Sequence, residues 1–190
     1  AAPLSCRYFD VQADRMATNR KTLRIGLMTP RLIHEIYRVI HDAHTRGETT
    51  PAEVNRVLGF AFIGLADTWP VIGITPAALD RYMQADFKRV TGLQRAHLHD
   101  RQVTISKMLN APLPLGEDEL LDLYRSRDVT VLGLSSENKS IASMSFYPLD
   151  SSRYFKSTGY GFAFTQKSEG RMLRALASDP PGLEPAAKYQ

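Results

Sequence analysis

The chain has 190 residues, of which 43% are apolar and 23% are charged, and its formal net charge is +4 at pH 7. These proportions are typical of soluble globular proteins and exclude collagen, coiled coils and wholesale disorder. The length predicts one globular domain over residues 1–177. Its one cysteine, Cys6, excludes an internal disulfide and a zinc site made of thiolates, so we expect a cytoplasmic protein.

The N-terminal part contains no export or membrane signal. The first residues lack the basic start and apolar core of a signal peptide. The longest apolar run, residues 57–66, reaches half of the roughly 20 residues that cross a bilayer, so we expect no membrane insertion. Leu4 to Val11 and Leu23 to Met28 are candidate strands.

Three Thr-Pro pairs predict three helix starts, because each places an N-cap hydroxyl before a proline at the first helical position. The first helix is expected from Pro30 to Arg46, and the second from Pro51 to about Ala66. After Val57 the second helix is apolar on almost every side, which predicts that it is buried on several sides. Thr50 and Glu53 also form a capping box. On the first helix, the side chains expected to face the core are Ile33, Ile36, Ile40 and Ala43. On the third helix, which begins at Pro76, they are Leu79, Tyr82, Met83 and Phe87.

Histidines on the first helix raise the question of a metal site. His34 and His41 are about 10.5 Å apart along a helix axis, too far for one ion. His41 and His44 stand at i and i+3 and would need a third ligand from elsewhere. Ordinary surface histidines remain the alternative, and the metal is left unassigned.

The densest polar cluster runs from Lys88 to Arg101. Within it, we expect Gly92 to Arg95 to follow a strand over Phe87 to Val90 and to precede a helix. Guanidinium forks and helix-start amides both bind phosphate. The predicted phosphate- or nucleotide-binding residues are Gly92, Arg95, Arg101 and Lys88, and the predicted catalytic residues are His97, His99 and Arg95. Residues 86–107 carry five Lys or Arg against two acids, which predicts DNA as the partner. A solvated helix face is the alternative.

The second half of the chain is rich in β-branched and aromatic residues, which predicts strands. They are expected over Val129 to Leu134, Ile141 to Tyr147 and Tyr154 to Thr165, the first two joined as a hairpin. Short helices are expected at about Glu117 to Arg125 and Glu169 to Ala177. The fold class is therefore α+β, with helices mainly in the front half and a mixed sheet. Residues 178–190 contain three prolines and predict a flexible tail that joins no ladder.

Glu137 and Asn138, followed by Lys139, lie in the proposed hairpin turn. A carboxylate, an amide and an ammonium group at one place would assist a metal or a phosphate as auxiliary residues. Turns contain the same residue types for purely local reasons, so this role requires the turn to lie beside His97.

No HExxH, Walker A, CxxC or GxSxG motif occurs, which leaves zincin, P-loop, thioredoxin and α/β-hydrolase chemistry without support.

Gly92-Leu-Gln-Arg95 resembles the Gly-x-x-Arg element that ParB nucleases and sulfiredoxins use at a phosphate or nucleotide. The chain as a whole resembles the oncogenic suppression (Osa) type of plasmid fertility inhibition factor in that fold group. The resemblance implies DNA cleavage and ATP hydrolysis that block conjugative or T-DNA transfer, with type IV secretion coupling components as partners. Leu93 stands where sulfiredoxins have a cysteine, which argues against sulfinic acid reduction.

A second resemblance is to HNH nucleases, in which a histidine activates water beside a divalent ion such as Mg²⁺. Arg95-Ala-His97, followed about forty residues later by Glu137-Asn138, is loosely similar to their pattern. A ββα unit places its histidine at a strand end, whereas the helix expected here contains His97. A third reading is a protein without catalysis that inhibits by occupying DNA or a secretion component. Dependence on ATP or a metal distinguishes that reading from the two nuclease readings.

Overall fold

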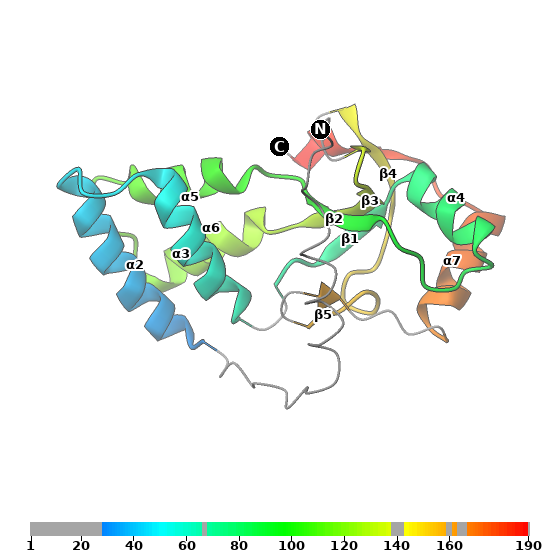
Figure 1. Ribbon diagram of the computed structural model, residues 1–190, viewed down its shortest axis with the longest axis horizontal. Coiled ribbons are helices and arrows are strands. Elements are labelled where there is room, and N and C mark those ends of the chain that lie inside the picture. Colours follow the sequence, from blue (N-terminus) through cyan, green and yellow to red (C-terminus); the bar gives the residue numbers. More distant parts are fainter. Residues whose placement is uncertain (1–27, 66–67, 138–142, 159–160, 163–166, 190) are drawn as a thin grey trace, which may run out of the picture.

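The computed structural model describes residues 28–65, 68–137, 143–158, 161–162 and 167–189. In chain order its elements are α2 (Pro30–Thr45), α3 (Pro51–Ile63), β1 (Val71–Ile74), α4 (Pro76–Gln84), β2 (Leu93–His97), α5 (Arg101–Leu109), α6 (Glu117–Arg127), β3 (Thr130–Leu134), β4 (Ser145–Pro148), β5 (Ser157–Thr158), β6 (Gly161–Phe162), α7 (Glu169–Ser178), β7 (Glu184–Pro185) and the 3₁₀ helix η3 (Ala186–Tyr189). Helices α2, α3, α5 and α6 form a bundle beside the sheet, and α4 and α7 lie on the other side of the molecule (Figure 1). The predicted α+β class is confirmed.

The three predicted Thr-Pro helix starts are confirmed. At each start the threonine is extended and its hydroxyl accepts a hydrogen bond from the backbone N–H three residues later. The capping box at the start of α3 also forms, because the Glu53 carboxylate accepts from the Thr50 amide at 2.9 Å. The helices expected at about Glu117 to Arg125 and Glu169 to Ala177 are present as α6 and α7, with ends shifted by two residues or fewer.

The buried faces of the helices differ from the predicted ones. Helix α2 buries Ile33 together with Tyr37 and His41, so a tyrosine and a histidine belong to its inner stripe. Helix α3 exposes Val57 and Phe60 to 54% each, so the prediction that it is buried on several sides is wrong. The prediction that Met83 turns inward on α4 is also wrong, since 48% of this residue is exposed.

The main sheet has the strand order β2-β3-β1-β4-β7. Strands β1 and β3 are parallel, and the other neighbours are antiparallel. The expected hairpin is therefore wrong: β4 pairs with β1, which lies between β4 and β3. The turn residues between these two segments predict that the chain reverses direction, but they do not determine which strand the returning segment pairs with. Residues 138–142 lie outside the described part of the chain.

The two faces of the sheet carry separate cores, because successive strand residues point to opposite sides. Leu132 packs with α4 and α7, while its neighbour Val131 packs on the other face with Phe146. Strand β1 contains a register shift after Val71, and Gly73 lies against Phe146. A Cβ atom on Gly73 would come within 2.1 Å of the Phe146 ring, so this position requires glycine.

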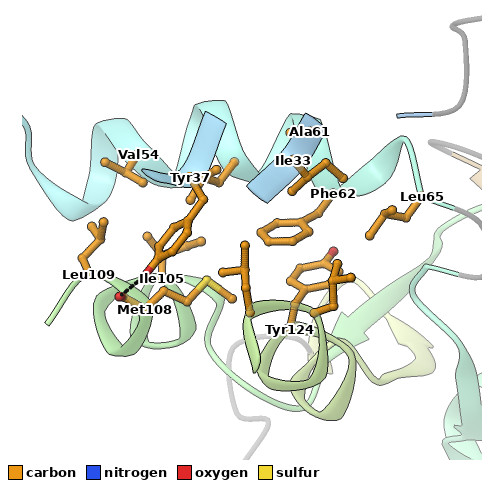
Figure 2. Packing of buried hydrophobic residues seen from close by; sticks show 13 residues of the cluster. Ile33, Tyr37, Val54, Ala61, Phe62, Leu65, Ile105, Met108, Leu109 and Tyr124 are labelled. Atoms are coloured by element: carbon orange, nitrogen blue, oxygen red, sulfur yellow. Dashed lines mark hydrogen bonds between the residues drawn. The ribbon is translucent and has the colours of Figure 1, made fainter. Parts of the chain in front are cut away.

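The four-helix bundle has its own core (Figure 2). Phe62 of α3 and Tyr124 of α6 stack at 3.8 Å between ring centroids, with an interplanar angle of 6°. The hydroxyl of Tyr37 donates to the Met108 carbonyl at 2.9 Å, and it accepts from the Leu115 amide at 3.0 Å. These contacts connect α2 and α3 to α5 and α6.

The C-terminal segments also depart from the predictions. Glu184–Pro185 pairs with Ser145 and Phe146, and Ala186 is fully buried, so the expectation that this segment joins no ladder is wrong. The pairing places Pro185 on an edge strand, where a missing N–H is tolerated. The expected strand over Tyr154 to Thr165 is instead a separate ribbon of β5 and β6, although residues 159–160 and 163–166 lie outside the description.

Leu4 to Val11 lies outside the described residues, and so does Leu23 to Met28 except for Met28, which belongs to no strand. Within the described ranges, no helix has both the length and the apolar character needed to cross a membrane.

Candidate functional site

Arg95 and His97 lie on strand β2, so the prediction of a helix at this point is wrong. They alternate with Ala96, which is buried in the sheet core, and they share the face of β2 that carries Leu93. The segment contains no β-branched residue, and its local propensity favours a helix. Its antiparallel ladder with β3, in which His97 faces Thr130, decides the strand.

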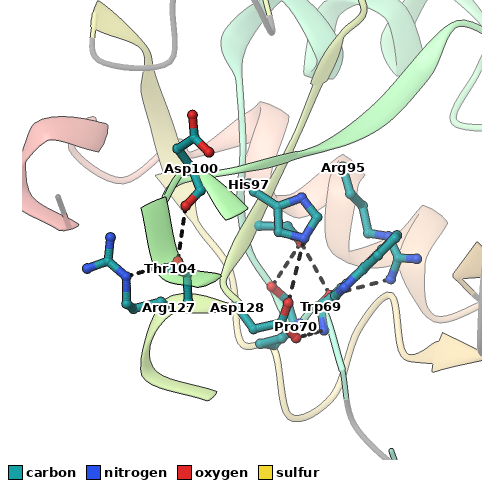
Figure 3. Close-up of polar contacts among 9 residues, drawn as sticks. Trp69, Pro70, Arg95, His97, Asp100, Thr104, Arg127 and Asp128 are labelled. Atoms are coloured by element: carbon teal, nitrogen blue, oxygen red, sulfur yellow. Dashed lines mark hydrogen bonds and ion pairs between the residues drawn. The ribbon is translucent and has the colours of Figure 1, made fainter. Parts of the chain in front are cut away.

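Two of the predicted phosphate-binding residues, Arg95 and Arg101, lie against Trp69, which precedes β1; Figure 3 shows Arg95 beside Trp69. The Arg95 guanidinium carbon lies 4.7 Å from the centre of the indole, and that of Arg101 lies 5.2 Å away. Arg95 also donates to the Trp69 carbonyl at 3.4 Å. Burial lowers the pKa of Arg95, opposed by the charge of Asp128, but a guanidinium stays charged at neutral pH.

His97 pairs with a buried carboxylate. Its Nε2 lies 3.6 Å from Oδ1 of Asp128, and its ring meets the Trp69 indole edge-on at 4.9 Å between centroids. Oδ2 of Asp128 accepts from the Trp69 backbone N–H at 2.7 Å, which fixes the carboxylate in place. Asp128 caps the C-terminal end of α6 just before β3 begins, and is only 5% exposed. The pair combines a titratable ring with a fixed anion, as proton-transfer sites do.

Two further arginines stand beside this pair on the bundle side. Arg101 is the first residue of α5, and the side chain of Asp100 caps that helix by accepting from the backbone N–H groups of Gln102 and Val103. Arg127, near the end of α6, donates through Nε to the Thr104 hydroxyl at 3.0 Å, and that hydroxyl donates to the Asp100 carbonyl at 3.0 Å (Figure 3). The site therefore carries a net positive charge, with the guanidinium groups of Arg95, Arg101 and Arg127 and the carboxylates of Asp100 and Asp128.

His99 has surroundings different from those of His97. It is 9% exposed and lies near Arg127 and Lys107. Burial lowers the pKa of His99, and the two positive charges lower it further. A neutral imidazole among cations is able to accept a proton, but the described part of the chain shows no ion pair of His99 with a carboxylate like that of His97 with Asp128.

Lys88 and Gly92 precede β2, at the end opposite to His97, and the strand alone spans about 13 Å from Leu93 to His97. The strand expected over Phe87 to Val90 is absent, and Gly92 starts no helix, so the predicted helix-start amides do not exist there. Gly92 has a φ of +81° with open space around its Cα, and its carbonyl accepts from Ser135. This positive φ explains why glycine occupies position 92.

Glu137 is not brought to His97. Its carboxylate accepts from the Thr75 hydroxyl at 2.8 Å and from the Leu134 amide at 2.7 Å, at the end of β3 remote from Thr130. The arrangement that resembles HNH nucleases requires His97 and Glu137 together, and these contacts contradict it. Asn138 lies outside the described residues.

The histidines of α2 each meet a backbone carbonyl, those of His34 and His41 in the connection between α5 and α6 and that of His44 just before α3. His34 lies 2.9 Å from that of Leu115 and His41 lies 3.0 Å from that of Ala111. Among the residues that the structure describes, no three His, Cys, Asp or Glu side chains are grouped so as to hold a metal ion.

Trp69, Asp128, Arg127 and Tyr124 were not singled out from the sequence. Trp69 is the only tryptophan in the chain, which is the one signal that draws attention to it. The others stand in ordinary helix-end and strand-start positions, and only the packing of α6 beside β2 and β1 brings them together.

Comparison of the chain with protein-family models, with curated proteins and with solved structures finds no significant match.

Proposed function

We propose that this protein binds DNA at the Trp69 site and cleaves a phosphodiester bond there. The observation that carries the proposal is the pairing of His97 with the buried Asp128 beside the Arg95 guanidinium. A phosphodiester carries negative charge that grows in the transition state, and fixed guanidinium groups stabilise it. The cationic surroundings of Trp69 therefore favour an anionic polymer as the partner.

In the proposed reaction His97 takes a proton from water as the water oxygen bonds to phosphorus. The phosphorus–oxygen bond to the leaving strand breaks, and that oxygen takes up the proton from His97. Asp128 faces one ring nitrogen, so it orients the ring and stabilises the imidazolium that forms. Arg95 binds the nonbridging oxygens.

The biological use implied by the resemblance to fertility inhibition factors is the blocking of conjugative or T-DNA transfer. ATP and Mg²⁺ remain candidate cofactors in this proposal. We derive no step through either of them.

The test is nicking of supercoiled plasmid with Mg²⁺, with EDTA, and with or without ATP. We expect His97→Gln to lose about a hundredfold in cleavage rate, the usual size of a general acid-base contribution, while DNA binding persists. Arg95→Gln should weaken both binding and cleavage. His44→Gln, on helix α2, is the matched control and should cleave normally.

Full nicking by the His97→Gln variant contradicts the catalytic role. If the wild-type protein binds DNA without cutting it under every condition, the inhibitor that acts by occupancy replaces the nuclease. Three guanidiniums at the site predict a fall of log K with log salt at a slope near −3 for duplex DNA.

A further inference from the structure

A second cationic surface lies around the start of α7, where three segments of the chain meet. These are residues 85–92, which connect α4 to β2, residues 150–156, and residues 167–174, which contain the first turns of α7. Together they carry seven Lys or Arg against three acids, an excess as large as the net charge of the whole chain. All seven cations are exposed: Lys88, Arg89, Arg153, Lys156, Lys167, Arg171 and Arg174. We call this region the α7 surface.

Contacts of two acids hold the three segments together. The carboxylate of Glu169, which is 3% exposed, accepts from the backbone N–H of Phe155 at 3.3 Å. Arg174 donates to the carboxylate of Asp86 at 2.9 Å, and its guanidinium lies over the Phe87 ring at 5.1 Å. Asp86 and Phe87 have φ angles of +50° and +55°, which residues other than glycine rarely adopt. The turn that presents the next two cations therefore depends on its packing against α7.

The acids of the α7 surface are engaged within the protein, whereas most of its cations are not. Glu169 is buried, and Asp86 is paired with Arg174. The third acid, Asp150, accepts from the backbone N–H and the hydroxyl of Ser152. Within the described ranges, all cations of this surface except Arg174 form no ion pair. Six positive side chains are thus left to bind an external anion.

The α7 surface and the Trp69 site lie on the same side of the sheet. Alternation along β2 gives Leu93, Arg95 and His97 one face of the sheet, and Leu93 packs there with residues of α4 and α7. Figure 1 shows the connection from α4 passing α7 on its way to β2. The two cationic regions are therefore separated by the length of β2, about 13 Å. A DNA duplex carries one charge per about 1.7 Å of its axis, so a short stretch of it reaches both.

We propose that the α7 surface binds the phosphate backbone of duplex DNA that flanks the phosphodiester held at the Trp69 site. This assignment rests on the proposed action on DNA. Cations spread over three segments suit a polymer with evenly spaced charges, and phosphate contacts position a protein without reading the sequence. Binding to a membrane surface needs exposed apolar side chains beside the cations. Among the described residues, none of the large exposed hydrophobic side chains belongs to these three segments.

The test compares the salt dependence of binding for a short and a long duplex. At about 3.4 Å per base pair, a hairpin of about six base pairs covers the Trp69 site and the length of β2, while a duplex of about 25 base pairs covers both cationic regions. Each neutralised phosphate adds about 0.9 to the slope of log K against log salt. We expect a slope near −3 for the hairpin and a slope steeper by about 2–4 for the long duplex.

A triple variant removes three exposed cations of the α7 surface: Lys88→Gln, Arg89→Gln and Arg171→Gln. It should lower the slope for the long duplex by about 2–3 and weaken its binding at least tenfold, while hairpin binding changes little. The matched control makes the same change in net charge on and just after α2, with Arg31→Gln, Arg38→Gln and Arg46→Gln. Because these arginines are exposed on the helix bundle, the control should keep the slope of the wild type for the long duplex.

Three outcomes overturn the assignment. One is an unchanged slope for the long duplex in the α7-surface variant. Another is an equal loss in both triple variants, because binding then follows the net charge and not the place of the cations. The third concerns vesicles that contain phosphatidylserine: if the α7-surface variant loses vesicle binding but keeps DNA binding, the surface faces a membrane.

Plasmid nicking separates this assignment from the nuclease proposal. The α7-surface variant retains Arg95 and His97, so it should nick plasmid with a raised KM and an unchanged kcat. If the wild-type protein cuts no plasmid but the variant loses affinity for the long duplex, the surface assignment holds and the nuclease proposal fails. If His97→Gln loses cleavage while the α7-surface variant binds the long duplex like the wild type, the nuclease proposal holds and the surface assignment fails.

Discussion

Two buried tyrosines of the helix bundle should respond in opposite ways to the same deletion. Tyr37 is 0% exposed and Tyr124 is 5% exposed, and both belong to the bundle core. The Tyr37 hydroxyl donates to the Met108 carbonyl at 2.9 Å and accepts from the Leu115 amide at 3.0 Å. The Tyr124 hydroxyl lies beside the Asp128 carboxylate and the Trp69 side chain but makes no hydrogen bond of good geometry to either. Replacing either tyrosine with phenylalanine removes one oxygen atom from a similar apolar setting.

The expected magnitudes follow from these contacts. Tyr37→Phe loses two hydrogen bonds, each with a net contribution of about 0.5–1.5 kcal/mol, and leaves the carbonyl of a fully buried residue unpaired. We expect a loss of about 2 kcal/mol in the free energy of unfolding. Tyr124→Phe removes an unpaired hydroxyl, so we expect no loss and a gain of up to about 1 kcal/mol. In a chain of this size about 1 kcal/mol corresponds to about 2–4 °C in Tm.

The assay is urea unfolding followed by far-UV circular dichroism. Tyr37→Phe should lower the midpoint with an unchanged m-value, and a thermal scan should show a Tm lower by about 4–8 °C. Equal losses for the two variants, or a loss below about 0.5 kcal/mol for Tyr37→Phe, would refute this reasoning.

Three other predictions concern the sheet and its ends. Burial, with nearby cations, holds the pKa of His99 below its usual 6.5. As the pH falls below about 6.5, His99 is therefore protonated in the unfolded chain before it is protonated in the folded protein, and the free energy of unfolding decreases until the pH reaches the folded pKa. His99→Gln should make this decrease smaller in urea titrations between pH 7 and pH 5. Gly73→Ala brings a Cβ atom within 2.1 Å of Phe146 and should cost at least about 1–3 kcal/mol, so an unchanged urea midpoint would contradict the close packing. Glu137→Ala loses the bonds from Thr75 and Leu134 and should cost about 1–3 kcal/mol while plasmid nicking by the folded protein continues; loss of nicking would return Glu137 to the site.

The sequence determined the helices whose signals are local. The N-cap hydroxyl of Thr50, the proline after it and the carboxylate of Glu53 act within four residues of one another, so their effect does not depend on the rest of the fold. The same holds for the helix that begins at Glu117, with its acidic first turn. Arg95, His97 and Arg101 could also be predicted as site residues, because they stand close together in one polar cluster.

The tertiary structure decided the strand that carries Arg95 and His97 and the partners that give these residues their chemistry. Helix-favouring residues form β2 because β3 supplies a ladder, which no local pattern encodes. Trp69 and Asp128 are far from His97 in the sequence; the start of β1 brings Trp69 beside it, and the end of α6 brings Asp128. Glu137 was a possible auxiliary residue only if its turn lay beside His97, and parallel pairing of β1 with β3 places it beside Thr75 instead. Side chains remote in sequence meet only when packing selects one strand order among several, and that selection depends on the whole core.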